Sequence, residues 1–560
     1  MMRDGIKLTI DYISPPLNKR FPVILELTPY GRGPLSINYR YEGQYWLNLG
    51  YIFVIGDCRG TGDSEGQMSF FQNEGKDGYD LIEWISNQTW SNGRIGMRGS
   101  SYTGTNQWFI AREQPPHLYC ITPSATIGRP MEDIPYLNGA FALNWAIDWI
   151  GKRVNIKWPF VTNETHWNPR TWLKHRTIRT LDVYVTGREL FLYREFLDHP
   201  TYDDYWRSID FQLEDFSKIK IPSLSFSGWF DGTLYGTIWH FKQIHHLFSD
   251  LNKHFLIVGP YTHGNAPDGG YDFSTGLPML TVGDISLEEN SLLPGLNMTE
   301  EFFNWCLKDG PKPVWKPVRF YITGSNRWMT RETFPPPLAH QKSLFLGSNG
   351  HANSIYGDGY LQWEYSSISL SDHYLFDPNN PLIISDYEKP LSLPVDMTPL
   401  LNRDDILVYT SEPLKKSLTV VGDISVELKI SSSAKDTDFI IHLMDVMPDG
   451  KSIKLGSKSA NQLRTRYRNG YDKEILMISN ETYLINIELH EIGHTFLYDH
   501  RIRLSITSSF YPWININPNT GYSIGLDTQS PLIANQTIYY HSNEPSRISM
   551  MVIDNPIFDS

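Results

Sequence analysis

The chain has 560 residues, of which 40% are hydrophobic and 14% aromatic, and its formal net charge is −13. A length of this order predicts about three to four domains with ample core, and the chain shows no concentrated basic face that could bind nucleic acid. No apolar run approaches the roughly 18 to 20 residues of a transmembrane helix. We therefore expect a soluble protein with neither a nucleic-acid nor a membrane partner.

The cysteines say little about the compartment. Cys58, Cys120 and Cys306 form a sparse and odd-numbered set, which argues against a disulfide framework. No signal peptide is visible at the N-terminus. Both a cytoplasmic and a secreted location stay open, and so does the oligomeric state.

Two loops follow the first buried strands. Thr28-Pro29-Tyr30-Gly31 lies just beyond a predicted strand over residues 21–27, where lipases place their oxyanion loop. Asp57-Cys58-Arg59-Gly60-Thr61-Gly62 follows a predicted strand over residues 51–55. This second loop lacks the Gly-Lys-Ser/Thr ending of a phosphate loop, so we predict no nucleotide cofactor. We interpret it as a tight loop in which Asp57 and Arg59 support a site.

A nucleophile elbow is predicted at Ser101. A turn at Ser91-Asn92-Gly93 and a short strand at Ile95-Gly96-Met97 precede Gly99-Ser100-Ser101-Tyr102-Thr103-Gly104, and a helix-compatible segment follows over residues 106–111. Such a turn lifts the serine out of the backbone and directs the next N–H toward a developing oxyanion. That N–H belongs to Tyr102. The phenol of Tyr30 is a candidate for the second oxyanion donor, the alternative being a tyrosine that only packs.

Residues from about 125 to 218 lose the strand–helix alternation and are rich in aromatic side chains. We interpret this stretch as a helical cap over the serine. Any one of its tryptophans is most simply a core residue, but together they suggest an apolar acyl pocket. They include Trp145, Trp149, Trp158, Trp167 and Trp172.

The sheet is predicted to resume with two strands that each end in a polar loop. The first covers residues 221–228 and leads to Trp229-Phe230-Asp231-Gly232, and the second covers residues 254–259 and leads to Pro260-Tyr261-Thr262-His263-Gly264. Open α/β sheets build their sites at these carboxyl ends. A serine needs a base and an orienting carboxylate. The order Ser101, Asp231, His263 is that of α/β-hydrolases.

After a helix around residues 300–307, the chain changes to strands and turns. Ile424, Val426, Leu428 and Ile430 alternate with polar residues, and Pro448-Asp449-Gly450-Lys451 predicts a turn between apolar segments. We expect a C-terminal β domain here.

One motif points to another chemistry. His490-Glu491-Ile492-Gly493-His494 matches the zinc-protease form H-E-x-x-H, and His500 falls where a third ligand would lie. That site requires a helix. The flanking residues alternate as in strands, and Leu497 stands where the longer motif needs glycine. We therefore predict a strand here and no metal site.

A family resemblance is visible in seven segments of the first 118 residues: Met2-Arg3-Asp4-Gly5, Thr28-Pro29-Tyr30, residues 57–66, residues 77–84, residues 90–97, Ser101-Tyr102 and Pro115-Pro116-His117-Leu118. They resemble the serine hydrolase family of cocaine esterase and the X-Pro dipeptidyl-peptidases. The resemblance extends over essentially the whole chain. It implies that Ser101 is the nucleophile, Tyr30 an oxyanion donor, and Asp231 and His263 the acid and base.

The fold that follows is an α/β-hydrolase with a helical cap insertion and a C-terminal β jelly roll. We expect a first hydrolase part over residues 1–124, the cap over 125–218, a second hydrolase part over 219–314 and the jelly roll over 315–560.

The predicted function is that of a serine hydrolase that cleaves esters of small or hydrophobic acids through an acyl-enzyme. Small-molecule esters or short peptides are the expected substrates. X-Pro dipeptidyl-peptidase activity is the alternative, and an inactive ligand-binding scaffold is a third reading. Relatives that cleave α-amino-acid esters carry carboxylates two and three positions after the catalytic aspartate, where this chain has Thr233 and Leu234. An ammonium site could instead come from Glu132, Asp133 or Asp148 in the cap.

Overall fold

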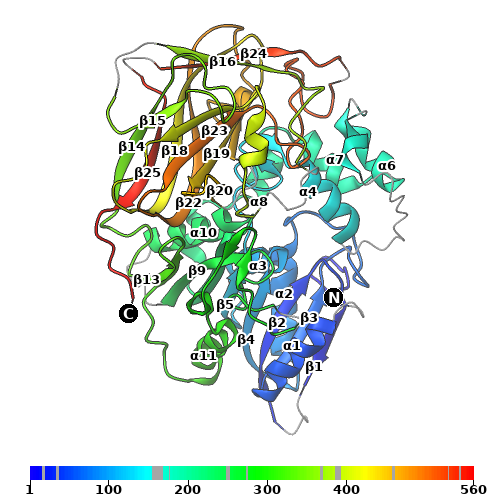
Figure 1. Cartoon of the computed structure of the whole chain (residues 1–560). Helices are drawn as coiled ribbons and strands as arrows, with labels where there is room; N and C mark the ends of the chain where they lie inside the picture. Colours follow the sequence, from blue (N-terminus) through cyan, green and yellow to red (C-terminus); the bar gives the residue numbers. More distant parts are fainter. Residues whose placement is uncertain are drawn as a thin grey trace.

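The computed structural model describes residues 1–14, 19–32, 37–153, 168–173, 175, 177–247, 253–272, 275–365, 370–384, 393–456, 461–527, 529–540 and 544–559. These residues form a helix-flanked parallel sheet, a set of cap helices and a β domain at the opposite end of the molecule from α11 (Figure 1). Within the described ranges, none of the helices has both the length and the apolar character needed to cross a membrane.

The first sheet has nine strands in the order β1-β3-β2-β4-β5-β8-β9-β12-β13. The strands from β3 to β12 in this order run parallel to one another, and β1 and β13 pair antiparallel at the two edges. The parallel part matches the predicted α/β alternation. The bounds are β1 Ile10–Ile13, β2 Phe21–Thr28, β3 Ile52–Asp57, β4 Ser91–Ser100, β5 Leu118–Ser124, β8 Ser223–Phe230, β9 His254–Thr262, β12 Val318–Ile322 and β13 Arg327–Arg331.

Helices cover both faces of this sheet, because its central strands are apolar on both sides. In β2, Val23 and Leu25 belong to one hydrophobic cluster with residues of α2 and α3, and Ile24 belongs to another with residues of α1 and α11. Successive side chains of a strand point to opposite faces, so two cores sandwich the sheet. The helices are α1 Ile37–Asn48, α2 Glu74–Ser86, α3 Tyr102–Arg112, α10 Leu234–Leu247 and α11 Gly295–Lys308.

One predicted turn is wrong. Ser91, Asn92 and Gly93 lie within β4 and do not form a turn before it. The pairing of β2 with β4 shifts register between Phe21 and Val23, and Gly93 has a φ of +83°. A β-bulge uses an extra residue in a conformation that glycine adopts readily, which explains why the sequence there looks like a turn.

The predicted helical cap lies between β5 and β8. It consists of α4 Leu143–Asp148, the π-helical turn η1 Trp149–Arg153, α5 Pro169–Trp172, the 3₁₀ turn η3 Ile178–Thr180, α6 Leu181–Thr186, α7 Phe191–Asp198, α8 Asp204–Ile209 and α9 Leu213–Lys218, with the short hairpin β6 Tyr136–Leu137 and β7 Ala140–Phe141. Trp158 and Trp167 lie outside the described residues.

The β domain is a 12-stranded assembly, largely antiparallel, around a core of its own. The predicted strand at residues 424–430 is part of β18, and the predicted turn at residues 448–451 connects β19 to β20. Between α11 and this domain, β12 pairs with β9 and β13 pairs with β12, so both strands extend the first sheet although they follow the expected boundary at residue 314. The strands are β14 His340–Gly347, β15 Tyr360–Gln362, β16 Ser371–Phe376, β17 Leu407–Ser411, β18 Leu418–Ser432, β19 Asp438–Val446, β20 Ser452–Lys454, β21 Asn461–Arg464, β22 Tyr483–Phe496, β23 Arg501–Thr507, β24 Ala534–Tyr539 and β25 Arg547–Ile553. A separate two-stranded sheet, β10 Thr281–Val282 and β11 Ile285–Ser286, lies between β9 and α11 in the chain.

Candidate active site

Ser101 sits in a strained turn between β4 and α3. Its φ is +63° and its ψ −124°, a conformation that non-glycine residues adopt rarely. Backbone hydrogen bonds hold it there, because Ser101 N–H donates to the Ser124 carbonyl at 3.0 Å and Thr105 N–H donates to the Ser101 carbonyl at 2.8 Å. A Cβ at Gly104 would lie 2.3 Å from the Ser124 carbonyl oxygen. The turn is therefore that of a nucleophile elbow, and Gly104 permits its close approach to β5.

Two donors meet beside the Ser101 hydroxyl. The Tyr30 hydroxyl donates to Ser101 Oγ at 3.5 Å, and the Tyr102 backbone N–H is directed at the Tyr30 phenol oxygen. Trp149 Nε1–H also donates to the Tyr30 hydroxyl, at 3.4 Å. Burial raises the pKa of the Tyr30 phenol above its ordinary value, against the opposing effect of these hydrogen bonds. The phenol thus stays protonated at neutral pH and keeps a hydrogen to donate.

Asp231 and His263 form the second part of the site. Asp231 directly follows β8 and His263 directly follows β9, and His263 Nδ1 lies 2.8 Å from Asp231 Oδ1. Asp231 is fully buried, and Thr233 donates to the same Oδ1 from its backbone N–H and its hydroxyl, both at 2.9 Å. Burial raises the pKa of Asp231, but His263 and the Thr233 hydrogen bonds outweigh it, so the pKa is lowered overall. The carboxylate is therefore ionised and orients the imidazole.

No pattern in the sequence predicts the role of Thr233. Its hydroxyl also lies 2.8 Å from the Ala125 carbonyl oxygen, so its one proton is shared between that carbonyl and the Asp231 carboxylate, and this ties the loop of Asp231 to the end of β5. A single threonine after an aspartate carries no recognisable pattern. Only the fold shows that it supports the carboxylate.

Aromatic side chains form a wall behind the serine. Tyr102 stacks between Phe71 and Trp149, with ring centroids 4.1 Å and 5.7 Å away, and Trp145 stacks on Trp149 at 5.2 Å. Phe70 packs edge-on against Trp145 and Trp149. Two of the predicted cap tryptophans thus reach the site region.

A buried carboxylate that no sequence motif indicates lies beneath this wall. Glu74 starts α2 and is 4% exposed, and it accepts a hydrogen bond from the Tyr102 hydroxyl. Burial raises the pKa of Glu74 to about 7, with the Tyr102 hydrogen bond acting in the opposite direction. Glu74 therefore holds the side chain of the residue whose N–H faces Tyr30.

The early loop after β3 is built around Asp57. Its carboxylate accepts from the backbone N–H groups of Arg32 at 2.9 Å and Asp63 at 3.0 Å, and the Arg32 guanidinium lies 3.0 Å away. A Cβ at Gly62 would lie 2.2 Å from Asp57 Oδ2. Arg59 instead pairs with Asp77 and Asp4. Both side chains brace the loop that connects β3 to the site.

The H-E-x-x-H segment lies on a strand, as predicted. His490 and His494 belong to β22, which pairs with β18 through a bulge at this point. His494 bonds Thr323 Oγ1 at 2.8 Å and Asp445 Oδ2 at 3.1 Å, and His500 Nδ1 bonds Asp445 Oδ1 at 2.8 Å. Glu491 pairs with Lys242 at 2.5 Å. Across the residues that the structure describes, no group of three or more His, Cys, Asp or Glu side chains is arranged to hold a metal ion.

The fold and the arrangement at the carboxyl ends of β4, β8 and β9 are those of α/β-hydrolase serine enzymes. Comparison with known families agrees. Residues 4–265 match the X-Pro dipeptidyl-peptidase (S15 family) model, and residues 314–549 match the X-Pro dipeptidyl-peptidase C-terminal non-catalytic domain. The chain belongs to the cocaine esterase and X-Pro dipeptidyl-peptidase family of serine hydrolases.

Individual relatives match nearly the whole chain. Cocaine esterase of Rhodococcus sp. (strain MB1 Bresler) is 28% identical over 580 residues, covering 99% of this chain and 97% of its own. An aminopeptidase from a marine sediment Thaumarchaeota archaeon is 25% identical, with a TM-score of 0.84 and coverage of 99% and 95%. An α-amino acid ester hydrolase, 24% identical, shares the fold with a TM-score of 0.83 and coverage of 98% and 95%.

Proposed function

We propose that the protein is a serine esterase for neutral esters of small or hydrophobic acids, with Ser101 as nucleophile. In this mechanism Ser101 Oγ attacks the ester carbonyl carbon while its proton passes to Nε2 of His263. Asp231 holds the other ring nitrogen and stabilises the imidazolium. The Tyr30 hydroxyl and the Tyr102 N–H donate to the oxyanion.

The tetrahedral intermediate then breaks its bond to the alcohol oxygen, which takes the proton from His263. This leaves the acyl group on Ser101. Water next attacks the acyl carbon and gives its proton to His263, and Ser101 recovers that proton as the acid leaves. No group outside this set of side chains and water is needed for the proton balance.

The observation that carries the proposal is the pairing of the Tyr30 hydroxyl with Ser101 Oγ at 3.5 Å in the strained turn. A tyrosine that only packs would not need its hydroxyl within hydrogen-bonding distance of Ser101 Oγ. The aromatic wall of Phe70, Phe71, Trp145 and Trp149 supports an apolar acyl group.

The choice of neutral esters rests on the carboxylates available to an ammonium group. At the position two after Asp231, Thr233 donates hydrogen bonds and brings no negative charge. Of the candidate cap carboxylates, Glu132 is engaged by Arg129 and the Tyr235 hydroxyl, and Asp133 accepts from the Gly128 N–H at 2.8 Å. An ammonium buried without a counter-ion would lose its hydration uncompensated.

The test compares methyl phenylacetate with phenylglycine methyl ester, which differ by the α-ammonium, and adds Ala-Pro p-nitroanilide. We expect kcat/KM to be highest for the neutral ester. Ser101→Ala should lower kcat by roughly 10⁶-fold, whereas Ser100→Ala, the neighbouring serine in the same turn, should retain it. Preference for Ala-Pro p-nitroanilide would indicate a dipeptidyl-peptidase, and an active Ser101→Ala enzyme would refute the nucleophile.

A further inference from the structure

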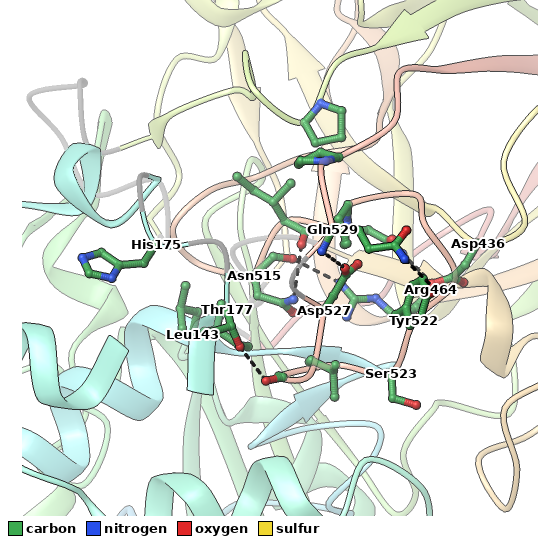
Figure 2. Close-up of a pocket in the computed structure, with 18 of the residues that line it drawn as sticks. Leu143, His175, Thr177, Asp436, Arg464, Asn515, Tyr522, Ser523, Asp527 and Gln529 are labelled. Carbon is green, nitrogen blue, oxygen red and sulfur yellow. Dashed lines mark hydrogen bonds between the residues drawn. The ribbon is translucent and has the colours of Figure 1, made fainter. Parts of the chain in front are cut away.

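A cavity of about 440 Å³ lies between the cap and the β domain. Cap residues from Leu143 to Leu181 line one side, and residues from Asp436 to Pro531 line the other (Figure 2). Tyr30, Ser101, Asp231 and His263 do not line it. Its volume is within the range of about 300–1,000 Å³ that small-molecule sites occupy. The cavity is therefore large enough for a ligand of its own.

Much of its wall is apolar. The cap contributes Leu143, Trp172, Ile178 and Leu181, and the β domain contributes Ile516 and Ile524 among others. The two sides are joined directly, because the Thr177 hydroxyl donates to the Gly525 carbonyl at 2.6 Å (Figure 2). Such a wall suits the hydrocarbon body of a ligand.

The polar part of the cavity carries more negative than positive charge. Arg464 is paired with Asp438 at 2.8 Å, and Arg466 is shared between Asp436 and Glu474, each at 2.9 Å. Both guanidiniums are thus already neutralised by carboxylates. Neither Arg464 nor Arg466 is therefore available to pair with an anionic ligand.

Asp527 is the lining carboxylate that pairs with neither of these two arginines. It is 7% exposed and lies among the labelled lining residues, next to Gln529 (Figure 2). It accepts hydrogen bonds from the Thr520 hydroxyl and, at 2.9 Å, from the Gln529 backbone N–H. Among the described residues, no lysine, arginine or histidine forms an ion pair with it. A buried charge without a counter-ion is costly, so this carboxylate favours a ligand that supplies one.

We propose that the cavity is a second binding site, distinct from the acyl site, for a small organic monocation with an apolar body. An ammonium group of the ligand donates to Asp527, and its hydrocarbon part packs against Ile178, Leu181 and Ile524. Hydrogen bonds to a charged group contribute more than neutral ones, by about 1 to 1.5 kcal/mol. A cation should therefore bind about tenfold more tightly than its neutral isostere.

The test uses 4-phenylbutylamine at pH 7 and its neutral counterpart 4-phenylbutan-1-ol, with dissociation constants measured by isothermal titration calorimetry. We expect the amine to bind about tenfold more tightly to the wild-type chain. Asp527→Asn keeps the size of the side chain and should bring the two affinities together. Asp472→Asn removes an exposed carboxylate outside the cavity wall, paired with Arg207, and should keep the tenfold ratio.

A second variant keeps the test decisive if Asp527→Asn folds poorly. Ile178→Trp adds an indole to the cavity wall and should abolish binding of both probes. Equal affinities for the wild type would overturn the proposal. So would an amine affinity that persists in Asp527→Asn and in Ile178→Trp, because the probe would then occupy the acyl site or another place.

Discussion

Tyr30→Phe should reduce kcat by about 10² to 10³-fold, because it removes one oxyanion donor and little else. The Tyr30 hydroxyl lies 3.5 Å from Ser101 Oγ. In the proposed mechanism, this Oγ is the atom that forms the new bond to the substrate. Burial raises the pKa of this phenol, so its proton is present throughout the neutral range. The loss corresponds to about 3 to 4 kcal/mol, and it should be the same from pH 6 to pH 9. Initial rates with p-nitrophenyl butyrate over that range measure it.

Trp149 offers a control for the same reasoning. Its indole N–H donates to the Tyr30 hydroxyl, so it affects the proposed oxyanion only indirectly, through Tyr30. Trp149→Phe should therefore cost less than Tyr30→Phe, and the double variant should behave like Tyr30→Phe alone, since coupled residues are not additive. An unchanged kcat in Tyr30→Phe would mean that the tyrosine only packs. Fully additive losses would refute the chain of hydrogen bonds.

Two further predictions concern Glu74 and the histidine motif. The pKa of Glu74 is raised from 4.5 to about 7 by burial, so its contribution to the free energy of unfolding, about 3 kcal/mol, is fully present below pH 4.5 and lost as pH rises through about 7. In Glu74→Gln, the fall in stability between pH 4 and pH 8, measured by urea unfolding, should be smaller by that amount, and an unchanged fall would contradict the burial argument. The segment that contains His490 and His494 is a strand, so we expect the purified protein to contain no stoichiometric zinc by elemental analysis. Its esterase activity should persist in EDTA. One zinc per chain, lost together with the activity, would contradict this prediction.

Local pattern was sufficient to predict the strands and the turn that position the candidate site. Glycines at 99 and 104 around Ser101 reflect close backbone approach, and this requirement is visible in the residues themselves. The apolar strands before Asp231 and His263 predicted that both would end at one edge of the sheet, and the structure joins them at 2.8 Å. These features depend on short-range constraints and on the shared direction of parallel strands.

What the sequence could not predict depends on contacts between distant segments. Trp149 was visible as a cap tryptophan, but its bond to Tyr30 joins residues 119 positions apart. Glu74 lies 28 positions from Tyr102, and no motif connects them. The bulge at Gly93 resembled a turn because both need the same backbone conformation. Local sequence propensity indicates the backbone conformation of a residue, whereas tertiary packing determines which distant residue its side chain contacts.

The H-E-x-x-H segment shows how a motif can arise from packing alone. A Cβ at Gly493 would lie 2.5 Å from the ring of Trp229, the residue two positions before Asp231. The Thr323 N–H donates to the Gly493 carbonyl at 3.0 Å, while His494 bonds the Thr323 hydroxyl. Lys242 of α10 forms an ion pair with Glu491. Glu491, Gly493 and His494 thus all contribute to the contact between the β domain and the hydrolase domain. Since Trp229 lies on β8, which ends one residue before Asp231, this contact also helps to place the carboxylate that orients His263.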